Sequence, residues 1–163
     1  MKKFKPFLIG ATILVVIFIV SSQNKKQESN TDISHGVYVY GDEISVKLVN
    51  QVIKVDVVST PEARSLGLSG RASLNKDQGM LFVFDTPGNY SFWMKDMNFP
   101  IDIIWFDEMG KVVYIQKDAQ PESYPEAFTP PKEKTSKYVL EVFSGFSLKH
   151  NLQVGGAIEF LPK

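Results

Sequence analysis

From Val37 onward the apolar residues recur mainly at every second position, and turn-forming residues interrupt them often. Val46 and Leu48 before Asn50, and Ile53, Val55 and Val57 after it, recur at every second position, which predicts two paired strands around Asn50. Alternation with period two is typical of strands buried on one face, whereas an amphipathic helix would show a period of 3.6. We therefore predict one mainly β domain over residues 37–163, a compact sandwich or barrel of about eight short strands with two short helices.

Capping and turn residues divide this domain into elements. Thr60-Pro61-Glu62 predicts the start of a short helix, because threonine caps helices and proline suits the first helical position. Residues 79–84 and 90–94 predict one antiparallel hairpin, and residues 101–107 and 111–117 predict a second. The remaining elements are a proline-containing loop over 119–136, a strand over 137–143, a helical turn within 144–150 and a closing strand over 156–161.

An uncharged apolar run extends from Phe7 to Val20, and residues 1–26 around it hold five lysines and no acid. As a helix this run would rise about 21 Å, which is short of the ~30 Å hydrocarbon core. That length is typical of a cleaved signal peptide or of a short signal anchor, so residues 1–22 predict one of these two, and we favour the anchor. Residues 23–36 are polar and predict a flexible tether. The domain would then lie outside the cytoplasm, on a single-pass membrane anchor or secreted.

Charge and composition exclude several kinds of chemistry. After residue 26 the chain carries 13 basic and 18 acidic side chains, a net charge of −5, and it has no phosphate-binding glycine loop. Both facts argue against nucleotide or nucleic-acid binding. The chain has no cysteine, and its two histidines, His35 and His150, are far apart. We therefore predict no disulfide, no lipoprotein attachment, no metal site and no cofactor.

Two carboxylates interrupt apolar strand faces. Asp102 shares a strand face with Ile104 and Phe106, and Glu141 shares one with Val139 and Phe143. A buried carboxylate needs a cation, a set of backbone donors or a function, because an unpaired one costs several kcal/mol. Candidate partners are Arg71 and Lys95. The carboxylates would then either pair with Arg71 to link a strand to a loop or form a polar cluster at the floor of a cleft.

The aromatic residues of the second predicted hairpin strand admit two interpretations. Trp93 and Met94 point to opposite faces of a regular strand, so one is expected in the core and the other in a pocket. Tyr90, Trp93 and Trp105 together would suit a platform for a sugar or another planar ligand, although aromatic residues in a small β domain commonly form the core.

Five segments in this order resemble the domain-of-unknown-function 192 family over about residues 46–160. The segments are TPEARSLGLSGR (60–71), GMLFVF (79–84), YSFWMKDMNFPIDIIWFDEMG (90–110), YVLEVFSG (138–145) and GGAIEF (155–160).

This resemblance implies a small, mainly β domain, often behind a signal or anchor, with no activity established for the family as a whole. The chain departs from the family where many members have a cysteine after a proline in the long loop, because Glu122 follows Pro121 here. Carried over by position, the family pattern falls on Gly67, Arg71, Gly79, Met80, Phe82, Phe84, Trp93, Met94, Pro100, Asp102, Glu141 and Gly145.

Three functions remain open at this point. We favour a non-enzymatic module, tethered to the membrane, that binds a small ligand or an envelope component. The alternatives are a glycan-directed hydrolase using Asp102 and Glu141 as acid and base, and a structural partner in the envelope. The favoured function predicts a cleft lined by Arg71, Trp93, Met94, Lys95, Asp102 and Glu141.

Overall fold

The computed structural model describes residues 43–162 of the 163-residue chain. The apolar run from Phe7 to Val20 and the predicted tether over 23–36 lie outside these residues. Within 43–162, no helix has the length and apolar character needed to cross a membrane.

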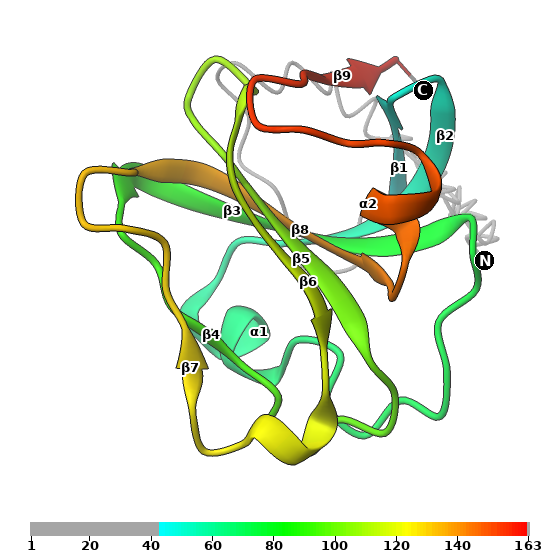
Figure 1. The fold of residues 1–163 in the computed structure, drawn as a ribbon, viewed down its shortest axis with the longest axis vertical. Helices are drawn as coiled ribbons and strands as arrows, with labels where there is room; N and C mark the ends of the chain where they lie inside the picture. The colour runs from blue at the N-terminus through cyan, green and yellow to red at the C-terminus, as the bar shows by residue number, and fades with distance from the viewer. Residues whose placement is uncertain (1–42, 163) are drawn as a thin grey trace, which may run out of the picture.

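The described residues form nine strands, two short α-helices and one 3-10 turn (Figure 1). The strands are β1 (Glu43–Leu48), β2 (Gln51–Val58), β3 (Gln78–Gly88), β4 (Phe92–Trp93), β5 (Ile101–Phe106), β6 (Val112–Ala119), β7 (Ala127–Phe128), β8 (Ser136–Phe143) and β9 (Ile158–Leu161). The helices are α1 (Pro61–Leu66), η1 (Pro121–Ser123) and α2 (Phe146–Lys149). The prediction of a mainly β domain with two short helices is confirmed.

Seven strands form one curled sheet in the order β6-β5-β8-β3-β2-β1-β9, and only β2 and β3 pair in parallel. The two edges of this sheet meet at one end, where Val112 N–H donates to the Gly156 carbonyl (2.8 Å) and Ile158 N–H donates to the Gly110 carbonyl (2.9 Å). Strands β4 and β7 form a separate two-stranded ribbon. The architecture is therefore a half-barrel, the second of the two predicted forms.

Local sequence accounts for the first elements. Val49 and Asn50, both with positive φ, make the two-residue turn between β1 and β2, as hairpins of this length require. Thr60 caps α1 by accepting a hydrogen bond from the Ala63 N–H, and Pro61 occupies the first turn. The predicted helix start is confirmed, as is the hairpin formed by β5 and β6.

The predicted hairpin between residues 79–84 and 90–94 is wrong. Strand β3 continues to Gly88, and β4 pairs with β7 through Phe92↔Phe128 and Trp93↔Ala127. The proline-containing loop brings β7 back across the sheet, so β4 finds its partner about 35 positions later in the sequence. Local pattern cannot reveal such a pairing, because both strands contribute only two residues.

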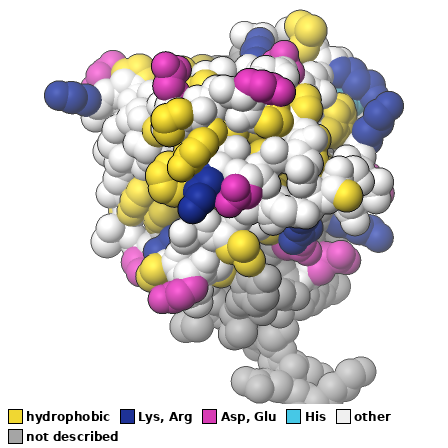
Figure 2. Space-filling view, turned by 90° about the horizontal axis from the view of Figure 1, so that it is seen from below, with side chains coloured by type: hydrophobic (Ala, Val, Ile, Leu, Met, Phe, Trp, Pro, Cys, Tyr) yellow, Lys and Arg dark blue, Asp and Glu magenta, His cyan; other side chains and the backbone are white. Residues whose placement is uncertain are grey.

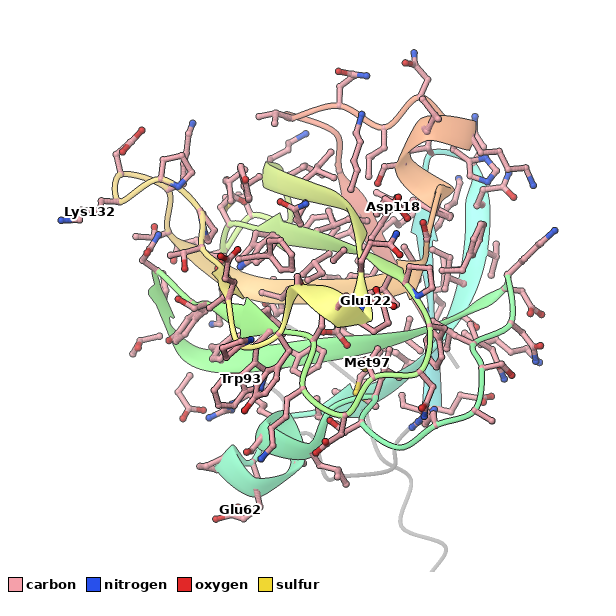
Figure 3. All side chains as sticks on the ribbon, turned by 60° about the horizontal axis from the view of Figure 1, so that its bottom comes forward. Glu62, Trp93, Met97, Asp118, Glu122 and Lys132 are labelled. Atoms are coloured by element: carbon pink, nitrogen blue, oxygen red, sulfur yellow. The ribbon has the colours of Figure 1, made fainter. Side chains whose placement is uncertain are left out.

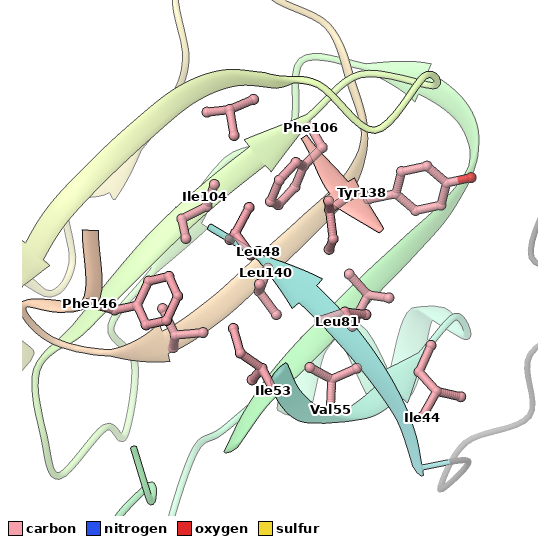
Figure 4. Packing of buried hydrophobic residues seen from close by; sticks show 14 of the residues in the cluster. Ile44, Leu48, Ile53, Val55, Leu81, Ile104, Phe106, Tyr138, Leu140 and Phe146 are labelled. Atoms are coloured by element: carbon pink, nitrogen blue, oxygen red, sulfur yellow. The ribbon is translucent and has the colours of Figure 1, made fainter. Parts of the chain in front are cut away.

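The sheet is buried on both faces at its centre. The inner face holds one apolar cluster, which includes Leu81, Ile104, Phe106, Leu140 and Phe146 (Figure 4). The outer face, covered by α1 and the β4–β7 ribbon, holds a second cluster: Val58, Ala63, Leu68, Met80, Phe82, Phe84, Met94, Ile101, Ile103, Trp105, Ala119 and Val139. All six residues of β5 are consequently buried.

Candidate ligand-binding cleft

A cleft of about 350 Å³ lies between α1 and the outer face of the sheet. This volume falls within the range of small-molecule sites. Figure 3 shows two of its lining residues, Trp93 and Met97, on the side of the sheet where α1 lies. The full lining is Pro61, Arg64, Ser65, Leu66, Gly67, Leu68, Ser69, Phe82, Phe84, Tyr90, Ser91, Phe92, Trp93, Met97 and Glu141.

Aromatic side chains form much of the wall. Phe82 makes an edge-to-face contact with Phe92 at 4.8 Å, and Phe84 stacks on Tyr90 at 3.5 Å between ring centroids. The loop after α1 covers the Phe82 ring at Gly67, where a Cβ would lie 3.4 Å from the ring, and Phe82 is only 2% exposed. Trp93 is 49% exposed and makes an edge contact with Tyr124, which leaves much of its indole open at the rim of the cleft.

Hydrogen bonds join the two loops beside the cleft. In the loop after α1, Ser69 Oγ donates to the Lys95 carbonyl and Gly70 N–H donates to the Asp96 carbonyl, each at 2.8 Å. Asn98 Nδ2 donates back to the Arg71 carbonyl at 2.8 Å. These three bonds hold the loop after α1 against the loop after β4, so the cleft is built before any ligand arrives.

Arg64 connects α1 to the sheet at the end of the cleft nearest Phe84. Its Nη1 donates to the carbonyls of Ser59 and Val83, the latter at 3.0 Å, and its guanidinium lies 4.9 Å from the centre of the Phe84 ring. The cleft wall thus already holds one planar cation against an aromatic face.

Glu141 supplies the buried acid of the cleft. It lies on β8 opposite Met80 of β3 and Ile103 of β5, so its closest strand neighbours are apolar. The residue is 4% exposed, and no donor among residues 43–162 forms a hydrogen bond with its carboxyl oxygens. The carboxyl therefore faces the cleft without a protein partner in the described part of the chain.

Burial raises the pKa of the Glu141 carboxyl to about 8, because a charged carboxylate loses its hydration there. The nearby positive charge of Arg71 acts in the opposite direction and lowers this pKa. Burial is the larger effect, so Glu141 is mostly protonated at neutral pH.

Arg71 pairs with neither of the carboxylates for which it was a candidate partner. Its Nη2 lies 2.7 Å from Asp56 Oδ2 on β2, and both side chains are well exposed. Asp56, Met80 and Glu141 occupy one row across β2, β3 and β8. Two strand spacings of ~4.8 Å therefore separate Asp56 from Glu141, about 10 Å in all.

Asp102 lies on the opposite, inner face of the sheet. It is paired with Val142, whereas its neighbour Ile103 is paired with Glu141, so the pleat sends the two carboxylates to different sides. Asp102 is fully buried and accepts backbone hydrogen bonds from Asp118 (2.9 Å), Gly145 (3.2 Å) and Ser147 (2.7 Å). These donors come from the end of β6 and from the start of α2, which this carboxylate joins.

The separation of Asp102 and Glu141 excludes them as an acid and base acting on one glycosidic bond. Such a pair must face one cleft at a separation of ~5–9.5 Å, and here the sheet lies between them. The expectation that both carboxylates form a single polar cluster is wrong for the same reason.

Of the six residues predicted to line the cleft, Trp93 and Glu141 do so. Met94 is 1% exposed and belongs to the outer apolar cluster, as the alternation of Trp93 and Met94 predicted for one of the two. Arg71, Lys95 and Asp102 lie elsewhere. The proposed three-ring platform also does not form, because Trp105 is fully buried and donates its Nε1–H to the Tyr90 carbonyl at 2.8 Å.

Sequence reasoning missed Arg64, Leu66, Phe84 and Met97 of the cleft. The signal at Phe84 was present, since it shares with Phe82 the strand face opposite to that of Leu81 and Val83. Arg64 and Leu66 carried no comparable signal, because a six-residue helix does not reveal which of its sides lies over a sheet.

The surface seen from below the view of Figure 1 combines apolar and charged side chains. Hydrophobic side chains gather there in several groups, with single basic and acidic side chains beside them (Figure 2).

Among the described residues, no group of three or more histidine, cysteine, aspartate or glutamate side chains is placed to hold a metal ion.

The fold and cleft define a small mainly β half-barrel domain, and comparison with known proteins gives its family. The family model DUF192, described as "Uncharacterized ACR", matches residues 44–160. The chain belongs to this family, as its motifs predicted. No curated protein matches the chain.

Solved structures of other proteins resemble this one. A Sinorhizobium meliloti 1021 protein described as a "putative transcription regulator" is 25% identical, with a TM-score of 0.69 over 77% of this chain and 98% of that one. A Novosphingobium aromaticivorans protein of unknown function is 24% identical, with a TM-score of 0.65 over 72% of this chain and 84% of that one.

Removal of the Asp102 carboxylate should destabilise the domain. Asp102→Ala leaves one buried and two partly buried backbone donors without an acceptor, and we expect a loss of about 3 kcal/mol or more in the free energy of unfolding, measured in urea. Asp85→Ala, on an exposed part of β3, is the control and should change stability by less than about 0.5 kcal/mol. Equal stabilities of the two variants would contradict the structural role of Asp102.

Glu141 should make the domain less stable as pH rises. Its folded pKa of about 8 exceeds the unfolded value near 4.5, so the folded state holds an extra proton between these values. The stability of the wild type should therefore fall from pH 5 to pH 9, by on the order of a few kcal/mol more than that of Glu141→Gln. Urea unfolding at several pH values tests this, with exposed Glu126→Gln as the control. Parallel pH profiles for wild type and Glu141→Gln would refute the shifted pKa.

Proposed function

We propose that this domain is a binding module that takes a small, partly apolar ligand into the cleft between α1 and the sheet. One observation carries the proposal: Glu141 is 4% exposed, lines the cleft and has no hydrogen-bond partner among the described residues. The hydrogen-bond partner of this largely buried carboxyl must therefore come from the cleft, and a bound ligand would supply it in place of water. The exposed face of Trp93 and the half-buried Phe92 ring supply apolar contact area.

Binding is favoured over catalysis because the cleft lacks an activated nucleophile. Its lining contains serines but no histidine, and two of the hydroxyls are already engaged. Ser69 Oγ bonds to the Lys95 carbonyl, and Ser91 Oγ bonds to Thr129 Oγ1 at 2.7 Å. A serine nucleophile needs an adjacent base, and Glu141, protonated at neutral pH, is poorly suited to that role.

Transcription regulation, the role given in the description of the Sinorhizobium meliloti structure, is not favoured here. After residue 26 the chain has 13 basic and 18 acidic side chains, a net charge of −5. Proteins that bind DNA neutralise phosphates with clustered lysine and arginine, and a net negative charge opposes this.

We further propose that residues 1–22 attach the domain to a membrane and place it outside the cytoplasm. The full chain should sediment with membranes, resist extraction by high salt and be released by detergent. A variant with Val15→Asp and Ile17→Asp keeps the length of the segment but should lose the membrane fraction. Soluble cytoplasmic full-length chain would refute the proposal, and a soluble exported chain shortened at its start would identify a cleaved signal peptide instead.

A fragment screen tests the binding proposal. Ligands of the cleft should change the fluorescence of Trp93 and the NMR signals of Trp93 and Met97, because both residues line the site. Trp93→Ala should weaken such ligands roughly tenfold by removing part of the wall. Leu148→Ala, which truncates a 76% exposed residue on α2, is the matched control and should leave affinity unchanged. Equal loss in both variants, or signals that change only away from the cleft, would contradict the proposal.

A further inference from the structure

The acid of the cleft lacks a cation of its own. Arg71 bears the positive charge that acts most on Glu141, yet its guanidinium is already paired with Asp56 at 2.7 Å. The direct neighbours of Glu141 across β3 and β5 are Met80 and Ile103, which are 2% and 0% exposed. An ionised carboxylate here would reach water only through the cleft and would have no counterion of its own among the described residues, which favours a ligand that brings a positive charge.

Resting on the proposed function, we propose that the ligand carries a protonated amine, which binds against the Glu141 carboxylate while its apolar part lies along Phe92 and Trp93. Aromatic rings attract cations through their faces. The guanidinium of Arg64 over Phe84, 4.9 Å from the ring centre, demonstrates this contact in the same cleft.

The two ends of the cleft differ in charge. Phe84, where Arg64 lies, is four residues along β3 from Met80, which is paired with Glu141. At ~3.3 Å per residue these positions are about 13 Å apart. A second positive group on the ligand would approach Arg64 and be repelled, so the site favours a monoamine whose far end is neutral or an acceptor.

Binding of an amine should be linked to release of a proton. The Glu141 carboxyl, mostly protonated at neutral pH, must lose its proton to form the ion pair. Affinity should therefore rise about tenfold from pH 6 to pH 7 and about fivefold from pH 7 to pH 8 before it levels off, while the amine itself stays protonated. The charged side chains on the elements around Glu141 are Asp56 in its own row on β2, Arg64 on α1 at the far end of the cleft, and Arg71, Lys95 and Asp96 in the two loops beside the cleft.

Three probes of similar shape separate the ligand classes: phenethylamine, 2-phenylethanol and phenylacetate. They are titrated into the full chain in detergent at pH 6, 7 and 8, with Trp93 fluorescence and calorimetry as readouts. We expect phenethylamine to bind most tightly, with close to one proton released at pH 7, detected as heat that depends on the buffer.

Two variants identify the residue responsible. Glu141→Gln should bind phenethylamine at least tenfold more weakly and lose the pH dependence, while keeping its fold because glutamine resembles the protonated acid; its unfolding at pH 6 verifies this. Glu62→Gln removes an exposed acid on α1 and should change neither quantity.

The outcomes distinguish the inference from the proposed function. Tighter binding of 2-phenylethanol or phenylacetate, or full affinity of Glu141→Gln for phenethylamine, would overturn the amine specificity and leave the cleft as a binding site. If none of the three probes changes the Trp93 signal and the wider fragment screen also fails, both proposals are refuted.

Discussion

The pairing of β5 with β8 at the centre of the curled sheet is the constraint on which the rest depends. Both strands are buried on both faces, so every polar side chain in them must be accommodated inside the protein. Each strand carries one carboxylate, and the pleat sends Asp102 to the inner face and Glu141 to the outer one. On each face of the sheet, the lost hydration of one buried carboxylate must therefore be compensated.

Asp102 and Glu141 are accommodated differently, and we assign a structural role to the first and a functional role to the second. Asp102 accepts hydrogen bonds from three backbone N–H donors, which compensate its lost hydration and join the end of β6 and the start of α2 to β5. Gly145 makes one of these contacts possible, because its φ of 84° favours glycine. Glu141 receives no such donors among the described residues, and burial shifts its pKa upward instead. An acid kept neutral beside a cleft is available to a ligand.

Several features of the site share a row of the sheet with Glu141 or lie directly above it. Strands β3 and β8 approach closely at Gly79, which pairs with Val142 next to Glu141. A Cβ at Gly79 would lie 2.7 Å from the Glu141 carbonyl oxygen, so only glycine fits there. Gly67 lies in contact distance of the buried Phe82 ring, so the loop after α1 closes over this part of the sheet. Asp56 and Arg71 form a salt bridge at the edge of the row, so the arginine does not neutralise Glu141. The acid, the aromatic wall and the missing counterion together suit a cationic ligand.

The sequence by itself determined the mainly β class, the capped helix α1 and the β1–β2 and β5–β6 hairpins, because alternation, caps and tight turns act over a few residues. It also marked Asp102 and Glu141 as carboxylates on otherwise apolar strand faces. Only the tertiary structure decided that β4 pairs with β7, that α1 covers Phe82 and Phe84, and that Arg71 pairs with Asp56. It also decided that the two carboxylates lie on opposite faces of the sheet. Each of these depends on which strands are neighbours, and strand order is set by the burial of the whole sheet rather than by any local pattern.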